Sequence, residues 1–246
     1  QVCMSVERLY VHERVYERFV SLVEKEVGKL VQGTGVEDDV GSMTFGKQID
    51  IVRAHVNQAL ENGAELVCGT APNEWEQSTM FLKPMVLTNV TGDMEIVREE
   101  TFGPILPIMS FSEESEAIRM ANSTQYGLNA SVWSQDLAKA KKIASRLVSG
   151  AVTINDVIIT VANHHLPFGG TKNSGIGRYH GKEGLRIFCH EKAVMMDRGR
   201  KISEIQWYPY RGKYADFKAM IESYYGEKTN WAGFLKRYLK LLKKGV

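Results

Sequence analysis

The feature that most constrains the fold is an alternation of short apolar stretches with longer amphipathic ones. In the amphipathic stretches apolar side chains recur at helical spacing, for example at Val15, Phe19 and Val23, which predicts helices with one buried face. Strands that alternate with helices indicate a parallel sheet with crossover helices, so we predict the α/β class. The predicted strands are residues 8–12, 64–69, 105–111, 129–134 and 151–155, and the predicted helices are residues 13–30, 46–62, 113–122 and 136–147.

Composition narrows the classes of function. The chain has 246 residues, of which 43% are hydrophobic and 24% charged, and its net charge of +2 argues against a surface dedicated to nucleic acid. Three scattered cysteines, Cys3, Cys68 and Cys189, are typical of a reducing compartment without disulfides. The sequence has no CxxC or HxxxH pair and no apolar run of the roughly 18 residues that a membrane span needs. We therefore expect a cytoplasmic protein without a metal site.

Three loops, residues 99–105, 155–165 and 166–181, are rich in residues that special backbone geometry requires. The stretch GGTKNSGIG in the third loop invites a phosphate-binding interpretation. It lacks the lysine position of a Walker loop and the GxGxxG order of a dinucleotide fingerprint. By itself it therefore predicts a tight loop in which two backbones approach closely.

Single residues in these segments leave more than one interpretation open. Cys3 alone would usually be a small buried hydrophobic residue. His164 and His165 either serve as bases or line a loop. Glu99 and Glu100 are adjacent, so at most one of them is expected to point into a site.

The motifs are more specific as an ordered set. QVC at residues 1–3, EETFGP at 99–104 and PFGGTKNSGIGR at 167–178 occur in the order and spacing of the C-terminal half of the aldehyde dehydrogenase superfamily. GSMTFGKQIDIV is similar to a further segment of that family, and EKAVMM resembles its closing strand. The chain resembles the family over roughly residues 1–197. The resemblance implies an aldehyde-dehydrogenase-like catalytic domain there, with a mainly parallel sheet flanked by helices.

The resemblance also implies roles for individual residues. Cys3 would be the nucleophile that adds to an aldehyde, and its own N–H would donate to the oxyanion. Glu100 would hold ribose hydroxyls of NAD or NADP, Phe102 would lie beside the nicotinamide ring, and Gln48 would add a cofactor contact, although Ser42 replaces the usual proline of its segment. The loop that lines the substrate tunnel would include Val157, Ile158, His164, His165 and Phe168. Gly169, Gly170, Ser174 and Gly177 would serve packing and turns.

These roles imply oxidation of an aldehyde to a carboxylic acid through a cysteine thiohemiacetal and thioester. The family's general base and nucleotide-binding domain lie upstream of the cysteine, so we expect the chain to be the catalytic part of a longer enzyme and inactive alone. Two alternatives stay open: an acylating enzyme that passes the thioester to coenzyme A, and a non-catalytic scaffold, against which an intact Cys3, Glu100 and Phe102 speak. In the family, a closing strand such as residues 192–197 adds to a partner's sheet, so a homodimer or homotetramer is expected by analogy.

Residues 198–246 form an extension of different character. From Lys228 onward there are six basic and no acidic residues. Apolar residues recur there at helical spacing: Trp231, Phe234, Leu235, Tyr238, Leu239 and Leu242. The pattern predicts a basic amphipathic helix, which either packs on its own domain or a partner subunit, or lies on an anionic membrane surface through residues 229–246. The stretch IQWYPYRGKYADF resembles the extension of the fatty aldehyde dehydrogenase branch, which implies a hydrophobic aldehyde and peripheral membrane contact.

Overall fold

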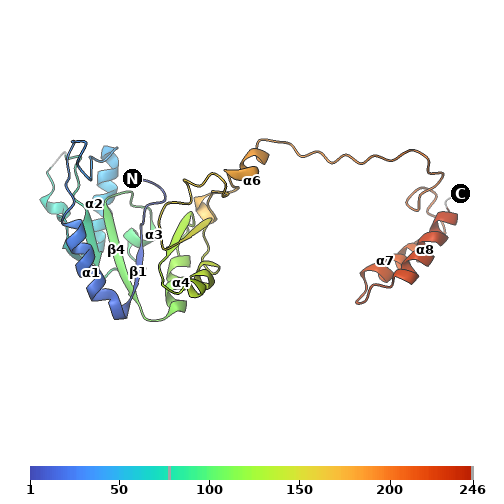
Figure 1. The fold of residues 1–246 in the computed structure, drawn as a ribbon, viewed down its shortest axis with the longest axis horizontal. Helices are drawn as coiled ribbons and strands as arrows, with labels where there is room; N and C mark the ends of the chain where they lie inside the picture. Colours follow the sequence, from blue (N-terminus) through green and yellow to red (C-terminus); the bar gives the residue numbers. More distant parts are fainter. Residues whose placement is uncertain (77–78, 245–246) are drawn as a thin grey trace. The chain divides into compact units, whose positions relative to one another are not determined.

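The structure is a computed structural model that describes residues 1–76 and 79–244 (Figure 1). The chain divides into two compact units, Gln1–His190 and Glu191–Val246. The last two residues of the predicted 229–246 segment lie outside the described residues. Each unit is described by itself.

The first unit is built on a four-stranded sheet in the order β1-β4-β3-β2. β1 pairs with β4 and β4 with β3 in parallel, whereas β2 runs antiparallel to β3. A separate parallel pair is formed by β5 and β6. The strands are β1 (Leu9–His12), β2 (Glu65–Cys68), β3 (Met85–Thr88), β4 (Ile105–Phe111), β5 (Asn129–Val132) and β6 (Ala151–Ile154). The predicted α/β class with mainly parallel pairing is therefore confirmed.

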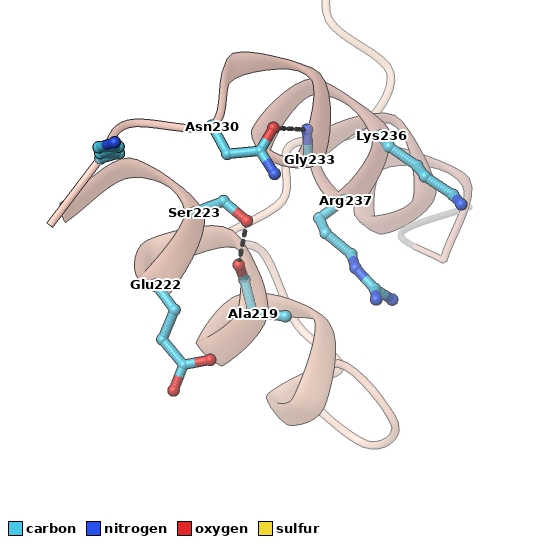
Figure 2. A pocket seen from close by; sticks show the side chains of 8 residues that line it. Ala219, Glu222, Ser223, Asn230, Gly233, Lys236 and Arg237 are labelled. Atoms are coloured by element: carbon cyan, nitrogen blue, oxygen red, sulfur yellow. Dashed lines mark hydrogen bonds between the residues drawn. The ribbon is translucent and has the colours of Figure 1, made fainter. Parts of the chain in front are cut away.

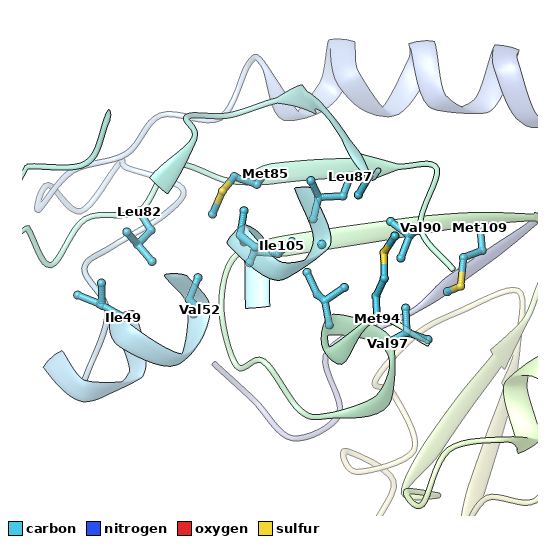
Figure 3. Close-up of a cluster of buried hydrophobic side chains, with 14 of the residues drawn as sticks. Ile49, Val52, Leu82, Met85, Leu87, Val90, Met94, Val97, Ile105 and Met109 are labelled. Carbon is cyan, nitrogen blue, oxygen red and sulfur yellow. The ribbon is translucent and has the colours of Figure 1, made fainter. Parts of the chain in front are cut away.

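Helices cover both faces of the four-stranded sheet. Side chains of successive strand residues point to opposite faces, so Val86 of β3 packs toward α1 (Glu13–Val27). Its neighbours Met85 and Leu87 pack toward α2 (Gly46–Glu61). Figure 3 shows this second cluster, in which Ile49 and Val52 of α2 meet the strand side chains. Each face is thus closed by the apolar stripe of one amphipathic helix.

The remaining helices of the first unit are short; three of them connect successive strands, and the last one follows β6. They are α3 (Glu95–Arg98), α4 (Glu114–Asn122), α5 (Leu137–Ala144) and α6 (Gly181–Arg186), with 3₁₀ turns at Pro72–Glu74 and Lys172–Ser174. The glycine-rich stretch forms a tight loop, as predicted. A Cβ on Gly170 would overlap the carbonyl of Ser174, and the Ser174 Oγ accepts a hydrogen bond of 2.9 Å from the Gly127 N–H.

The second unit ends in a hairpin of two helices, α7 (Tyr214–Tyr225) and α8 (Trp231–Lys243). Asn230 caps α8, because its Oδ1 accepts from the Gly233 N–H at 2.9 Å. Leu241 is the fully buried apolar residue of α8, and it lies outside the predicted stripe. No helix within the described ranges combines the length and the apolar character needed to cross a membrane.

Asp216 of α7 holds the hairpin together electrostatically. Its Oδ1 accepts from Arg237 at 3.0 Å and from Lys240 at 2.9 Å, and its Oδ2 accepts from Lys244 at 2.8 Å. Asp216 as a whole residue is only 3% exposed. Hydrogen bonds from these three cations hold the pKa of Asp216 well below its usual range. Half of the six cations of the predicted basic face are thus engaged within the hairpin.

Asp216→Asn is expected to loosen this hairpin at neutral pH, because three cations would then converge on a neutral amide. The ionised carboxylate stabilises the folded hairpin at every pH above about 4, the pKa of an aspartate in the unfolded chain. This stabilisation is lost progressively as the pH falls below that value and the carboxylate is protonated. Hydrogen exchange of the α7 and α8 amides should therefore be faster in the variant at pH 7, and the difference should shrink in acid.

Glu222→Gln is the matched control on the same helix. Its carboxylate faces Lys218 at 3.9 Å and both side chains are mostly exposed, so its loss should change exchange little. Equal acceleration by both substitutions would contradict the role given to Asp216.

Candidate active site

Two segments with sequence-predicted site residues meet at one edge of the main sheet. The turn that contains Cys3 leads into β1, and the loop of residues 99–104, which contains Glu100 and Phe102, leads into β4. β1 and β4 are parallel neighbours, with Leu9 opposite Ile108. Parallel strands begin at the same edge of a sheet, so the pairing brings these segments together although about a hundred residues separate them.

Cys3 lies in an exposed turn. The turn is closed by a hydrogen bond of 2.9 Å from the Ser5 N–H to the Val2 carbonyl, and Met4 beside it is buried. Gln1 fixes the segment further, since its Oε1 accepts from the Thr44 N–H at 2.8 Å. The thiol is exposed and free. Cys3 therefore differs from most single cysteines, which are small buried hydrophobic residues. An exposed thiol on an anchored backbone is accessible to an electrophile.

Glu99 and Glu100 have different surroundings, as their adjacency suggested. The Glu99 carboxylate accepts from the Tyr126 hydroxyl at 3.0 Å and from Gln125 Nε2 at 3.2 Å. Within residues 1–76 and 79–244 the Glu100 carboxylate accepts no such bond, and it is half-buried. Burial raises the pKa of Glu100, the neighbouring charges of Glu7 and Glu99 add to the rise, and Arg8 opposes it. Glu100 is thus the glutamate with free acceptor oxygens.

The loop backbone around Phe102 is held from two sides. Gln48 Nε2 donates to the Thr101 carbonyl at 2.7 Å, so the amide group predicted to contact a cofactor is turned toward the loop. His55 Nδ1 lies 3.1 Å from the Thr101 Oγ1 in a buried contact. On the other side the Glu7 carboxylate accepts from the N–H groups of Thr101 and Phe102, both at 3.2 Å. The sequence did not single out Glu7, His55 or Thr101 as site residues.

The predicted substrate-loop residues lie on the connection after β6. Val157 is half-buried, whereas Ile158, His164 and His165 are exposed. Ile158 has a positive φ of 63°, which is rare for a β-branched residue. Among the described residues no hydrogen bond joins this connection to the Cys3 turn.

Phe168 differs from the other residues of this predicted loop. It is 4% exposed, bonds to Tyr179 through both backbone groups, and packs against the rings of Tyr179 and His180. The structure therefore places Phe168 in a local core. A substrate-lining role for its ring stays a prediction.

Comparison with known proteins decides the family. The sequence profile described as "Aldehyde dehydrogenase family" matches residues 1–194. The chain belongs to the aldehyde dehydrogenase family. The match covers the Cys3 turn, the 99–104 loop and the glycine-rich loop, so the resemblance inferred from those motifs is confirmed.

Relatives in this family act on different aldehydes. The 4,4'-diapolycopene aldehyde oxidase of Methylomonas sp is 45% identical over 230 residues, which cover 93% of this chain and 42% of that protein. The NADP⁺ succinate-semialdehyde dehydrogenase GabD of Escherichia coli (strain K12) is 37% identical over 194 residues, covering 78% of this chain and 39% of that protein. The first alignment is longer than the 194 residues that match the profile, so that similarity continues into the extension. The chain spans about two fifths of the length of these curated relatives.

Solved structures agree with the fold. Betaine aldehyde dehydrogenase from Staphylococcus aureus, in complex with NAD⁺, superimposes with a TM-score of 0.75 at 30% identity, and the match covers 85% of this chain and 41% of that one. An aldehyde dehydrogenase from Bacillus cereus gives a TM-score of 0.70 at 36% identity, covering 75% of this chain and 37% of that one. The first unit therefore has the fold of the family.

Proposed function

We propose that this chain carries the nucleophile and part of the cofactor site of an NAD(P)-dependent aldehyde dehydrogenase. The observation that carries the proposal is that the Cys3 turn and the 99–104 loop lead into neighbouring parallel strands, with an exposed Cys3 thiol on one segment and a half-buried Glu100 on the other. The chain spans about two fifths of its relatives, so the activity is proposed for the polypeptide that carries it and not for these residues alone.

The chemistry assigned to this chain centres on Cys3. Its thiolate sulfur forms a bond to the carbonyl carbon of the aldehyde, and the carbonyl oxygen becomes the oxyanion of a thiohemiacetal. The Cys3 N–H would donate to that oxygen. Loss of a hydride from the carbon re-forms the carbonyl and leaves a thioester. Water then breaks the carbon–sulfur bond, which releases the carboxylic acid and restores the thiol.

A nicotinamide cofactor would supply the hydride acceptor when bound, and residues of the 99–104 loop fit such a group. The free carboxylate of Glu100 can accept from two hydroxyls of a ribose, which is chemistry suited to a carboxylate without other partners. Phe102, two positions further along the loop, is half-buried. NAD⁺ and NADP⁺ both occur among the relatives, so either is proposed here.

The substrate proposed is a hydrophobic aldehyde. The relative with 45% identity is named for a diapolycopene aldehyde, and its similarity extends beyond the catalytic portion. The second unit of this chain exposes large apolar side chains, among them Trp207, Tyr208, Tyr214 and Trp231. Exposed aromatic residues in such number are typical of a surface that contacts apolar ligands or partners.

The test is the absorbance of reduced cofactor with a panel of short, long apolar and aromatic aldehydes. The polypeptide that carries this chain would be assayed with NAD⁺ or NADP⁺, with and without coenzyme A. Turnover without coenzyme A, fastest with long apolar aldehydes, supports the proposal. Turnover only with coenzyme A would favour the acylating enzyme, and no turnover under any condition would favour a scaffold.

We also propose a homodimer or homotetramer in a reducing, cytoplasmic compartment. Residues 192–197, expected to add to a partner's sheet, form no strand within the described chain. They present Val194, Met195 and Met196, and Met195 is 98% exposed, which favours burial against a second copy.

All three cysteines are free, which agrees with the reducing compartment that we propose.

Peripheral contact with an anionic membrane is a second proposal, which the surface of α8 favours. Trp231, Leu235 and Leu239 are exposed on this helix. A groove between α7 and α8 is lined by Lys228, Lys236, Arg237, Asn230 and, from α7, Ser223 and Glu222 (Figure 2). Of its three cations, Arg237 is also bound to Asp216. Apolar side chains next to cations suit the boundary between acyl chains and anionic headgroups.

Leu235→Glu combined with Leu239→Glu is expected to reduce binding to anionic vesicles several-fold, because both changes place charge on the exposed apolar stripe. The measurement is co-sedimentation with vesicles of phosphatidylserine and phosphatidylcholine, with pure phosphatidylcholine as the control. Binding that is equal in parent and double variant, or equal on both vesicle types, would remove the membrane proposal.

A further inference from the structure

We propose that Glu7 is a positioning residue that fixes the 99–104 loop to the strand of the nucleophile. The inference rests on the proposed function, since the loop is taken to hold the cofactor. Glu7 lies between the Cys3 turn and β1. Its carboxylate bridges to a loop that is distant in sequence, since Thr101 lies 94 positions after Glu7.

The contact is a paired one. Oε2 of Glu7 accepts from the Thr101 N–H and Oε1 accepts from the Phe102 N–H, both at 3.2 Å. Two consecutive backbone donors are thereby satisfied by one charged side chain. Thr101 is 2% exposed, so its amide would otherwise be buried without a partner, which is costly. Bonds to a carboxylate are also stronger than those between neutral groups.

The loop needs such support because its conformation is unfavourable by itself. Phe102 has a positive φ of 46°, a region that residues with a side chain rarely adopt unless their surroundings over-determine it. Gly103 is equally constrained, because a Cβ there would lie 2.7 Å from the Val52 Cγ2. Gln48 holds the Thr101 carbonyl from the α2 side. Glu7 supplies the anchor on the Cys3 side.

Glu7 also acts on Glu100 through its charge. Burial is the largest cause of the raised pKa of Glu100; the charges of Glu7 and Glu99 add to the rise and Arg8 opposes it. The Tyr126 hydroxyl also feels the Glu100 charge, which helps to raise the pKa of Tyr126. Removing the charge of Glu7 therefore lowers the pKa of Glu100. If cofactor binding needs the ionised Glu100, the pH below which binding weakens must move downward in a Glu7→Gln variant.

The experiment compares Glu7→Ala and Glu7→Gln with the parent in the polypeptide that carries this chain. Glu24→Gln is the matched control, because Glu24 is an exposed glutamate on α1. Two readouts are independent of turnover: hydrogen exchange of the Thr101 and Phe102 amides, and the dissociation constants of NAD⁺ and NADP⁺ by calorimetry across pH.

Glu7→Ala should accelerate exchange of both amides and weaken cofactor binding, each by about tenfold. Glu7→Gln keeps one acceptor oxygen, so its effects should be smaller, with the binding profile shifted to lower pH. Unchanged exchange overturns the inference, and so does faster exchange with unchanged cofactor affinity and pH profile. A parent that binds cofactor but oxidises no aldehyde would overturn the proposed function alone.

Discussion

Replacing Cys3 with serine is expected to lower aldehyde-dependent formation of reduced cofactor by about 10³-fold or more, as the loss of a covalent nucleophile does. A hydroxyl ionises far less readily than a thiol, so serine would sit in the same anchored turn without forming the thiohemiacetal. The turn depends on backbone and side-chain contacts of Ser5, Met4 and Gln1, none of which involves the sulfur. The variant should therefore fold and still bind cofactor.

Cys189→Ser is the matched control for this loss. Cys189 is also exposed and free, and its thiol donates to the Leu185 carbonyl at 3.5 Å. It lies beyond the connection from β6 and far along the chain from the predicted nucleophile. The control should keep nearly full turnover. A Cys3→Ser enzyme with parental turnover would contradict the assignment of the nucleophile.

Glu100→Gln is expected to raise the dissociation constant of the nicotinamide cofactor by roughly tenfold to a hundredfold, because hydrogen bonds to a charged group contribute about 1.5–3 kcal/mol. The parent should also bind cofactor less well in mild acid, since burial raises the pKa of Glu100 and the carboxylate is protonated earlier on lowering the pH than an ordinary glutamate. Calorimetry across pH measures both effects. The Gln variant should lose this acid dependence.

Glu99→Gln provides the control from the adjacent position. The Glu99 carboxylate is engaged by Tyr126 and Gln125, so its replacement should affect the stability of that contact and leave cofactor affinity close to that of the parent. If Glu99→Gln weakened cofactor binding more than Glu100→Gln, the roles of the two glutamates would have to be exchanged.

Periodicity alone predicted most elements of the first unit, because its amphipathic helices bury one regular face. It missed β3, in which Met85, Val86 and Leu87 are all buried. A central strand covered on both faces reads as a short continuous apolar run without alternation. The sequence also did not predict that β2 runs antiparallel to β3. The direction of β2 is set by the path of the chain between the two strands and not by the local pattern of residues.

The second unit shows a different limit. The basic amphipathic pattern predicted α8, but α7 was missed, and with it the partner that engages Arg237, Lys240 and Lys244. A run of cations is usually read as a solvated face. Asp216 supplies the countercharge from another helix, which only the tertiary structure reveals.

Sequence motifs indicated the residues proposed to take part in the chemistry. They did not indicate the residues that hold the site in place through contacts between segments distant in sequence. Cys3, Glu100 and Phe102 were assigned through an ordered set of motifs, and their roles stay predictions. Glu7 precedes an arginine and a strand, which is typical of a solvated position, and nothing local indicates its bonds to the 99–104 loop. Gln48 was expected at the cofactor, and the contact it makes in the structure is with the Thr101 carbonyl.

The most direct test of the central claim is to trap the acyl-enzyme. The polypeptide that carries this chain would be mixed with a long apolar aldehyde and oxidised cofactor, quenched in acid, and digested for mass spectrometry. We expect the peptide containing Cys3 to gain the mass of the aldehyde less two hydrogens, the signature of a thioester. Turnover without this adduct on Cys3, or with the adduct on Cys68 or Cys189 instead, would contradict the central claim.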